Sequence, residues 1–400
     1  MPSLRTFSSL RLPSFRYYLG MYWCGMAVQD MRTVAQSLLI YRLTGSVALL
    51  GVMALVNTLP SIVLPLAGGV IADRLPKKNT IILGQMGTLF TLMIIAVSLG
   101  FGFMSAERAG SWWILMVASF ISHAFAGLVG ASRQAIVTDL VGTDQIMNAI
   151  SLRTLGYNVL HMGAPALAGV LIDALDFAWV YYLMSAITVI AIIFTLFMPF
   201  SGSAAAQLVD GLKYVRSERN ILFLLLFTLI SITLTRPYIR LMPVFVDDIL
   251  EVGATGMGVL LSVSAIGALV SSLVMASLPS KRRGAMLLIA SIVLGLALVV
   301  FAFSRSWYLS LVVIIFVGMG QSARATLGNT LLQAYTAPNY RGRVMSLYGM
   351  EEGTASLGVF VAAMLAEVYG VPWTVGGFAI VVILLALLAL AFLPRMRKLD

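Results

Sequence analysis

Two apolar stretches, each long enough to cross a lipid bilayer, are joined through the segment GVIADRLPKK at residues 69–78, which is polar from Asp73 onward. A membrane-spanning helix needs about 20 consecutive apolar residues. The preceding stretch, 47–72, and the following one, 80–103, both reach that length. A basic turn between two such stretches belongs at the membrane surface, because positive side chains are costly in the hydrocarbon. The segment therefore predicts a helical hairpin in a membrane.

The pattern of this hairpin continues along the whole chain of 400 residues. Hydrophobic residues make up 60% of the sequence and charged residues only 10%, whereas soluble domains carry about 25% charged residues. We therefore exclude a water-soluble fold and expect an all-α membrane protein. The predicted spans, twelve in number, are 16–42, 47–72, 80–103, 112–138, 146–173, 178–200, 220–246, 255–278, 284–304, 307–334, 343–369 and 372–394.

The longest polar interruption lies at the centre of the chain, at residues 201–219. It predicts an N-terminal six-helix bundle at 1–200, a cytoplasmic linker at 201–219 and a C-terminal six-helix bundle at 220–400. Two internal similarities support a duplicated unit: 50–79 resembles 257–284, and 149–173 resembles 344–367. Because the matches occur in the same order in both halves, we expect two pseudo-symmetric bundles.

The basic residues concentrate in alternate loops. With the N-terminus in the cytoplasm, 17 of the 26 Lys and Arg face the cytoplasm, while the opposite loops gather acidic residues. This asymmetry predicts a multi-pass protein of the cell membrane with both termini cytoplasmic. The net charge of +10 is thereby explained by orientation, and we expect no nucleic-acid partner.

Motifs for other kinds of chemistry are missing from the sequence. One cysteine, Cys24, and two histidines argue against a disulfide framework and a structural metal site. We find neither the Gly-x-x-x-x-Gly-Lys phosphate loop of a primary pump nor the nucleophile and zinc motifs of a membrane-embedded enzyme. A receptor or channel is disfavoured by the duplicated spans. We expect no cofactor, no metal and no catalytic residue.

The opening segment resembles the signature loop of the major facilitator superfamily, G-x-x-x-D-R-x-G-R-K. The pattern is matched by Gly69, Asp73, Arg74, Lys77 and Lys78, whereas Pro76 replaces the usual glycine. The resemblance implies the major facilitator fold and an inner gate in which the acid latches one conformation. The alternative is an ordinary basic loop. Arg133 and Asp139, at the inner end of the fourth predicted span, are expected to join the same charge network.

A second resemblance lies in the fifth predicted span, in GAPALAG at 163–169. Gly163, Pro165 and Gly169 are similar to the family's antiporter motif, G-P-x-x-G-G, although Ala164 interrupts the glycine-proline pair. Generic packing of small residues is the alternative interpretation. Together with the stretches 131–141, 236–245 and 341–350, the motif resembles the exporter branch that includes enterobactin exporters and macrolide-efflux proteins.

Ionisable residues inside predicted spans are functional candidates, because a charge in the membrane is costly. Asp30 lies beside Gln29 and Arg32 in the first span, and it could carry a proton or close an outer gate with Arg236 or Arg240 of the seventh span. Glu351 and Glu352 lie about ten residues into the eleventh span and are the leading candidates for proton coupling.

The alternative for the two glutamates is a fixed pairing with Arg324 of the tenth span or Arg153 of the fifth. Adjacent side chains diverge by about 100° on a helix, so we expect only one of the two to couple. Lone histidines such as His123 and His161 are more often packing residues than proton relays.

These observations favour a secondary transporter that works by alternating access. We expect proton-coupled export of small amphipathic compounds, drug-like or siderophore-like. Uptake, or translocation of lipids or lysolipids, by the same fold is the alternative. The expected partners are a small-molecule substrate, protons and the lipid bilayer, and we expect a monomer.

Overall fold

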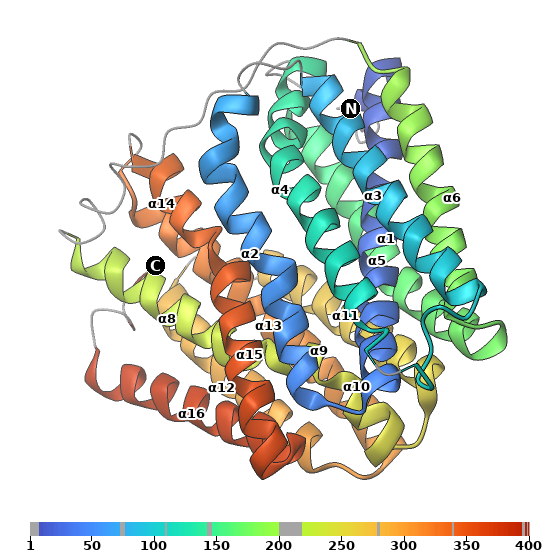
Figure 1. The fold of residues 1–400 in the computed structure, drawn as a ribbon. Helices are drawn as coiled ribbons and strands as arrows, with labels where there is room; N and C mark the ends of the chain where they lie inside the picture. The colour runs from blue at the N-terminus through green and yellow to red at the C-terminus, as the bar shows by residue number, and fades with distance from the viewer. Residues whose placement is uncertain are drawn as a thin grey trace. The chain divides into compact units, whose positions relative to one another are not determined.

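The computed structural model describes residues 8–72, 77–108, 110–141, 146–199, 218–277, 281–337, 340–393, 397 and 399. Within these ranges, the side chains of 8, 61–72, 128, 130–135, 137–139, 146–147, 219–220, 276 and 343 are not described. Every described secondary-structure element is helical (Figure 1).

The N-terminal half consists of long helices joined by short connections. They are the short η1 (Ser8–Arg11), then α1 (Pro13–Thr44), α2 (Val47–Ala72), α3 (Lys77–Gly100), α4 (Trp113–Val141), α5 (Ile146–Ala174) and α6 (Phe177–Leu196).

The C-terminal half contains two helices that are interrupted where the sequence predicts continuous spans. Its elements are α8 (Arg219–Thr235), α9 (Pro237–Arg240), α10 (Met242–Val244), the π-helix η3 (Phe245–Ile249), α11 (Gly253–Ser277), α12 (Arg283–Phe303), α13 (Trp307–Tyr335), α14 (Arg341–Tyr348), α15 (Glu351–Tyr369) and α16 (Val371–Phe392). Pro237 and Pro243 explain the first interruption, because proline lacks the amide hydrogen that a continuous helix requires. The second falls at Gly349 and Met350.

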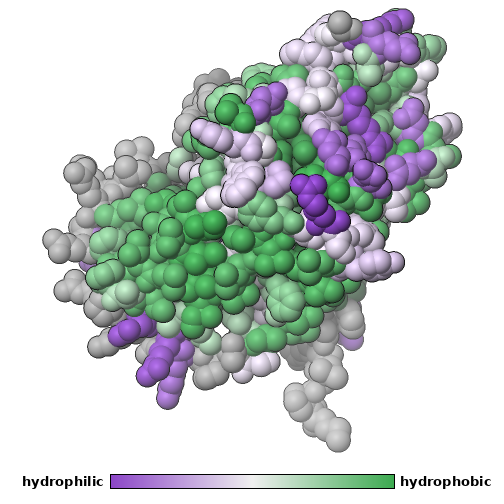
Figure 2. Space-filling view, turned by 90° about the horizontal axis from the view of Figure 1, so that it is seen from below, coloured by the Kyte–Doolittle hydropathy of each residue, from purple (hydrophilic) through white to green (hydrophobic). Residues whose placement is uncertain are grey.

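Each of the twelve predicted spans coincides with a helix or with such an interrupted helix. Eight helices in the described ranges are long and apolar enough to cross a membrane, by length and composition. The helix α1 is not among them, and it carries both Asp30 and Arg32. Large apolar side chains such as Phe90, Trp179 and Leu388 are exposed, and Figure 2 shows a broad hydrophobic surface. The all-α membrane fold is confirmed.

The chain divides into two compact units. One comprises Met1–Thr44 and Val56–Ala206, and the other comprises Gly45–Leu55 and Gln207–Asp400. The first turns of α2 group with the second unit because they pack on α15: a side chain at Gly51 would overlap Ala363. Most of the expected linker, 201–217, lies outside the described residues, and the domain boundaries at 200 and 220 stay a prediction.

Each unit has its own apolar core at one end of its helices. In the first unit, Phe15, Tyr18, Ile81 and Ile136 are buried together from α1, α3 and α4. In the second, a comparable cluster joins α8, α12, α13 and α16. The cores hold the helix ends together, which leaves the polar side chains near the middles of the helices as the candidates for function.

Candidate functional site

Asp30 lies in the middle of α1, and its partner is a histidine. The carboxylate Oδ1 is 3.0 Å from Nδ1 of His161 on α5. The side chain of Asp30 is 11% exposed, whereas that of His161 is 42% exposed and stacks on the ring of Tyr157. Asp30 Oδ2 is buried and has no hydrogen-bond partner among the described residues. The structure thus places a buried acid against a base that can reach water.

Arg32 follows Asp30 by two residues and faces a different helix. Two residues correspond to about 200° around a helix, so the two charges point away from each other. Arg32 is buried, and its Nη1 donates to Ser122 Oγ on α4 at 2.9 Å. It lines a cavity of about 270 Å³ together with Gln29, Gln85 and Thr88.

Amide and hydroxyl groups continue this polar region along α1. Gln36 Nε2 donates to Ser119 Oγ on α4 and to Asn57 Oδ1 on α2, the latter at 3.4 Å. Asn57 Nδ2 donates in return to Gln36 Oε1 at 3.2 Å. All three side chains are buried. Since the groups satisfy one another, this network stabilises the packing of α1 and offers no site of its own.

In the second unit, Arg324 of α13 pairs with Glu351 of α15. The distance from Nη1 to Oε1 is 3.2 Å, and the side chains are 2% and 14% exposed. Arg324 Nη1 also donates to the carbonyl of Thr228 on α8 at 3.4 Å, and Glu351 contacts Tyr348 as well. Glu351 is therefore paired with Arg324, which is one of the two arginines that the sequence analysis gave as alternatives to proton coupling.

Glu352, the neighbouring acid, belongs to a more exposed pair. Its Oε1 accepts from Arg236 Nη2 at 3.1 Å, and the glutamate side chain is 74% exposed. Arg240, one turn further along, also interacts electrostatically with Glu352. The second unit thus brings together five of the predicted candidates: Arg236, Arg240, Arg324, Glu351 and Glu352. The predicted gate between Asp30 and Arg236 or Arg240 stays a prediction.

The basic loop is only partly described. Lys77 and Lys78 are buried, and Lys78 Nζ donates to the carbonyls of Leu196 and Met198, each at 2.7 Å. A positively charged ammonium group stabilises the C-terminal end of α6, because it donates to carbonyls that have no partner within the helix and lies at the negative end of the helix dipole. Lys78 therefore has a packing role that the motif did not predict. Asp73 and Arg74 lie outside the described residues, as do the side chains of Arg133 and Asp139 and the surroundings of Gly69.

The antiporter-like motif lies within α5, with Pro165 inside the helix. Pro165 and Gly169 are buried, whereas Gly163 is exposed. A methyl group added at Gly163 would meet nothing within 4 Å. Close packing therefore does not require a glycine at 163.

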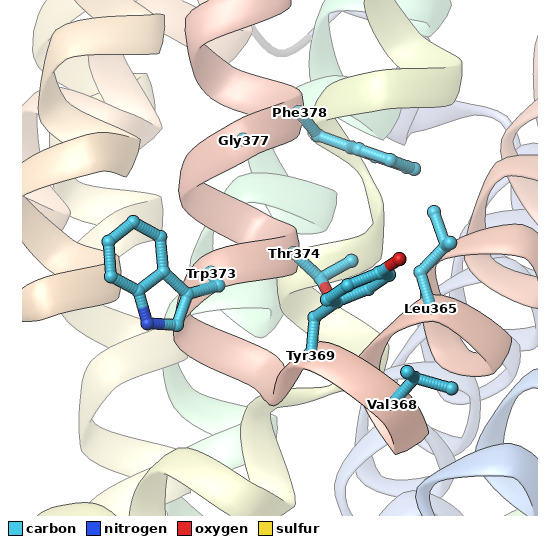
Figure 3. A pocket seen from close by; sticks show the side chains of 7 residues that line it. All are labelled: Leu365, Val368, Tyr369, Trp373, Thr374, Gly377 and Phe378. Carbon is cyan, nitrogen blue, oxygen red and sulfur yellow. The ribbon is translucent and has the colours of Figure 1, made fainter.

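The described residues contain no group of three His, Cys, Asp or Glu side chains that could hold a metal ion. A larger hollow, of about 690 Å³, lies between α15 and α16 (Figure 3). Its lining is apolar and aromatic, with Tyr369 and Trp373 largely exposed. Such residues are typical of a membrane interface, and the lining offers no charge to recognise a polar substrate.

Comparison with known proteins shows which family this chain is similar to. A sequence profile described as Major Facilitator Superfamily matches residues 18–350 and again 221–400. The multidrug efflux pump Tap of Mycolicibacterium fortuitum is 25% identical over 386 residues, covering 92% of each chain. The enterobactin exporter EntS of Shigella flexneri is 26% identical over 350 residues, covering 83% of this chain and 81% of the exporter.

Solved structures share the fold at low sequence identity. A bacterial homologue of the human lysosomal transporter Spinster superposes with a TM-score of 0.73 at 13% identity, covering 99% of this chain and 98% of the homologue. The nucleoside transporter NupG gives a TM-score of 0.72 at 15% identity, covering 94% and 98%. At such identities the likeness establishes the fold alone.

Proposed function

Because this chain belongs to the Major Facilitator Superfamily, we propose that it exports small amphipathic compounds in exchange for protons. Members of the family are secondary transporters of small molecules in a membrane, and the chain is not an enzyme. The finer points of the proposal are the direction of transport, the coupling ion and the class of substrate.

The direction rests on one observation. The two relatives described above, an efflux pump and an exporter, align with this chain over at least 81% of their own length. The match therefore covers both halves of the transporter rather than one shared motif. The excess of Lys and Arg in alternate loops supports the part of the proposal that places both termini in the cytoplasm.

Coupling to protons is supported by the contacts of Asp30. Glu351 and Glu352 each form an ion pair with an arginine, at 3.2 and 3.1 Å, so a proton on either carboxylate would leave its arginine without a counter-ion. Asp30 instead contacts His161, and an imidazole can accept a proton at one ring nitrogen while it donates one from the other. We therefore propose Asp30 as the leading proton carrier, with His161 as its route to water, and keep Glu351 and Glu352 as the second choice.

Two other titratable groups on helices packed against α1 have partners away from Asp30. Arg153 on α5 lies over the ring of Tyr22, and His123 on α4 contacts the carbonyl of Ser119. A proton on the Asp30 pair would cancel one charge inside the first unit. The carrier could then reorient without substrate, because a neutral pair costs less in the membrane than a charged one.

Proteoliposomes with an acidic lumen test direction and coupling together. We expect the purified chain to accumulate 8-anilino-1-naphthalenesulfonate, an amphipathic anion whose charge is fixed over this pH range, in the acidic lumen, with the membrane potential clamped by valinomycin. A protonophore and protein-free liposomes are the controls. Accumulation only in an alkaline lumen would indicate uptake with protons and would overturn the proposal.

Asp30→Asn should reduce accumulation of the substrate against its gradient by about tenfold or more. Downhill exchange of the substrate should stay measurable. Asparagine resembles the protonated acid and so removes the carrier without removing the hydrogen bond to His161. Glu107→Gln, in an exposed loop, is the matched control and should behave as the wild type. An undiminished pH response in Asp30→Asn would transfer the role to Glu351 or Glu352.

A further inference from the structure

The cavity beside Arg32 lies inside the first unit, between α1, α3, α4 and α6. Its lining is mixed: methionines and small apolar residues form most of the wall, and the polar lining residues are Gln29, Arg32, Gln85, Thr88 and Thr188. Among the described lining residues, Arg32 is the only one with a charge. The lining residues used below are Gln29, Gln85, Thr88 and Arg32.

Arg32 has no acidic partner among the described residues. The side chain is 8% exposed, and its described hydrogen bond goes to the neutral hydroxyl of Ser122. Its Nε is buried without a partner, and so is the hydroxyl of Tyr181, which interacts electrostatically with Arg32. A buried charge is normally paired, because removal from water is otherwise uncompensated. This guanidinium therefore lacks an anion.

Two further donors line the cavity. Gln85 is buried, and its Oε1 accepts from Thr195 Oγ1 at 3.0 Å. The amide oxygen of Gln85 is therefore engaged by Thr195, whereas its amide nitrogen has no partner among the described residues. The hydroxyl of Thr88 is likewise uncommitted there. A guanidinium, an amide and a hydroxyl around one space form a set suited to an oxyanion.

We propose that this cavity binds the oxyanion of an amphipathic organic acid, with Arg32 as its counter-ion. The inference rests on the proposed function, whose substrate class it narrows to anionic compounds. Whole drug-sized ligands fill about 300–1,000 Å³, so a cavity of about 270 Å³ takes the acidic end of a substrate. The remainder of the molecule extends past Gln29 and Ala126, the two exposed residues among those that line the cavity.

Direct binding tests the site without any flux measurement. The full chain, in nanodiscs of phosphatidylcholine, is titrated with dansylglycine and with its neutral analogue dansylglycinamide. We expect the acid to bind at least about tenfold more tightly than the amide, since a charge-assisted hydrogen bond contributes that much. Equal affinity for the two probes would overturn the proposal.

Variants assign the preference to Arg32. Arg32→Gln should weaken binding of the acid by about tenfold to one-hundredfold and leave the amide unchanged, while Arg32→Lys keeps the preference. Arg42→Gln makes the same change on α1 outside the cavity and is the matched control. Retention of the full preference for the acid in Arg32→Gln would refute the site.

Gln85→Glu provides a test if Arg32→Gln does not fold. It keeps the oxygen that accepts from Thr195 but places a negative charge in the cavity, so the acid should lose its advantage over the amide. Undiminished binding of the acid in this variant would contradict the proposal.

Native mass spectrometry separates the two sources of the anion. If a lipid headgroup occupies the site, phosphatidylglycerol stays bound to the wild type but not to Arg32→Gln, and the narrowing of the substrate class is wrong. If the site binds a transported acid instead, binding of phosphatidylglycerol does not depend on Arg32 and is equally tight in the wild type and in Arg32→Gln. This outcome supports the proposal. Because binding needs no pH gradient, a failure of export and a failure of this site are distinguishable.

Discussion

The ion pair of Arg324 and Glu351 differs from that of Arg236 and Glu352 chiefly in burial. Arg324 is 2% exposed, whereas Glu352 is 74% exposed. Removing one partner of a buried pair leaves an uncompensated charge, which costs about 3–5 kcal/mol. Exposed pairs contribute about 0–1 kcal/mol. The two adjacent glutamates therefore have different structural importance despite their identical chemistry.

Glu351→Gln should therefore lower the thermal stability of the detergent-purified protein clearly, and Glu352→Gln should hardly change it. Thermal unfolding followed by intrinsic fluorescence measures both. Replacing the whole pair, as Arg324→Leu with Glu351→Leu, should recover part of the loss, because no charge is then left buried. A Glu352→Gln variant as unstable as Glu351→Gln would show that burial does not separate the two sites.

At the scale of the helix, Gly163 and Gly358 occupy equivalent positions of the internal repeat but differ in their surroundings. Gly358 of α15 faces the backbone of α8 so closely that a methyl group would overlap the carbonyl oxygen of Thr233. Gly163 of α5 has open space around it. These positions are aligned by the internal repeat, yet packing requires a glycine at only one of them.

We expect Gly358→Ala to destabilise the protein by about 1–3 kcal/mol through overpacking. Gly163→Ala should be neutral or stabilising by up to about 1 kcal/mol, because alanine favours a helix over glycine. Thermal unfolding of the two variants is the measurement. If Gly163→Ala keeps its stability but loses transport, the antiporter-like motif acts through motion of α5 rather than through packing.

At the scale of the whole molecule, the distribution of basic residues predicts which side of the membrane each loop faces. In a Cys24→Ala background, single cysteines are introduced at Lys281, Tyr308 and Val368, all exposed residues. A membrane-impermeant maleimide added to intact cells should label Tyr308→Cys and Val368→Cys but not Lys281→Cys. Labelling of Lys281→Cys in intact cells, with the other two protected, would reverse the orientation.

The sequence by itself determined the architecture of this protein. Twelve apolar stretches of span length can satisfy their backbone hydrogen bonds in lipid only as helices, so the described helices follow the predicted spans closely. The family could also be predicted from the sequence, because its motifs are local patterns. They lie in the segment at 69–78 and in the stretches around Pro165 and Arg236. Interruptions such as the one at Gly349 and Met350 were not predicted, because span-length averages of hydropathy do not detect them.

Only the tertiary structure decided how the buried charges are paired. Composition and spacing identified Asp30, Arg32, Glu351 and Arg324 as costly in a membrane, but the partner of each side chain lies on another helix. His161 is 131 residues from Asp30 along the chain, and a lone histidine in a span carries no sign of an acid opposite it. The rotation and contact of packed helices determine whether such a group becomes an ion pair, a proton carrier or an unpaired counter-ion.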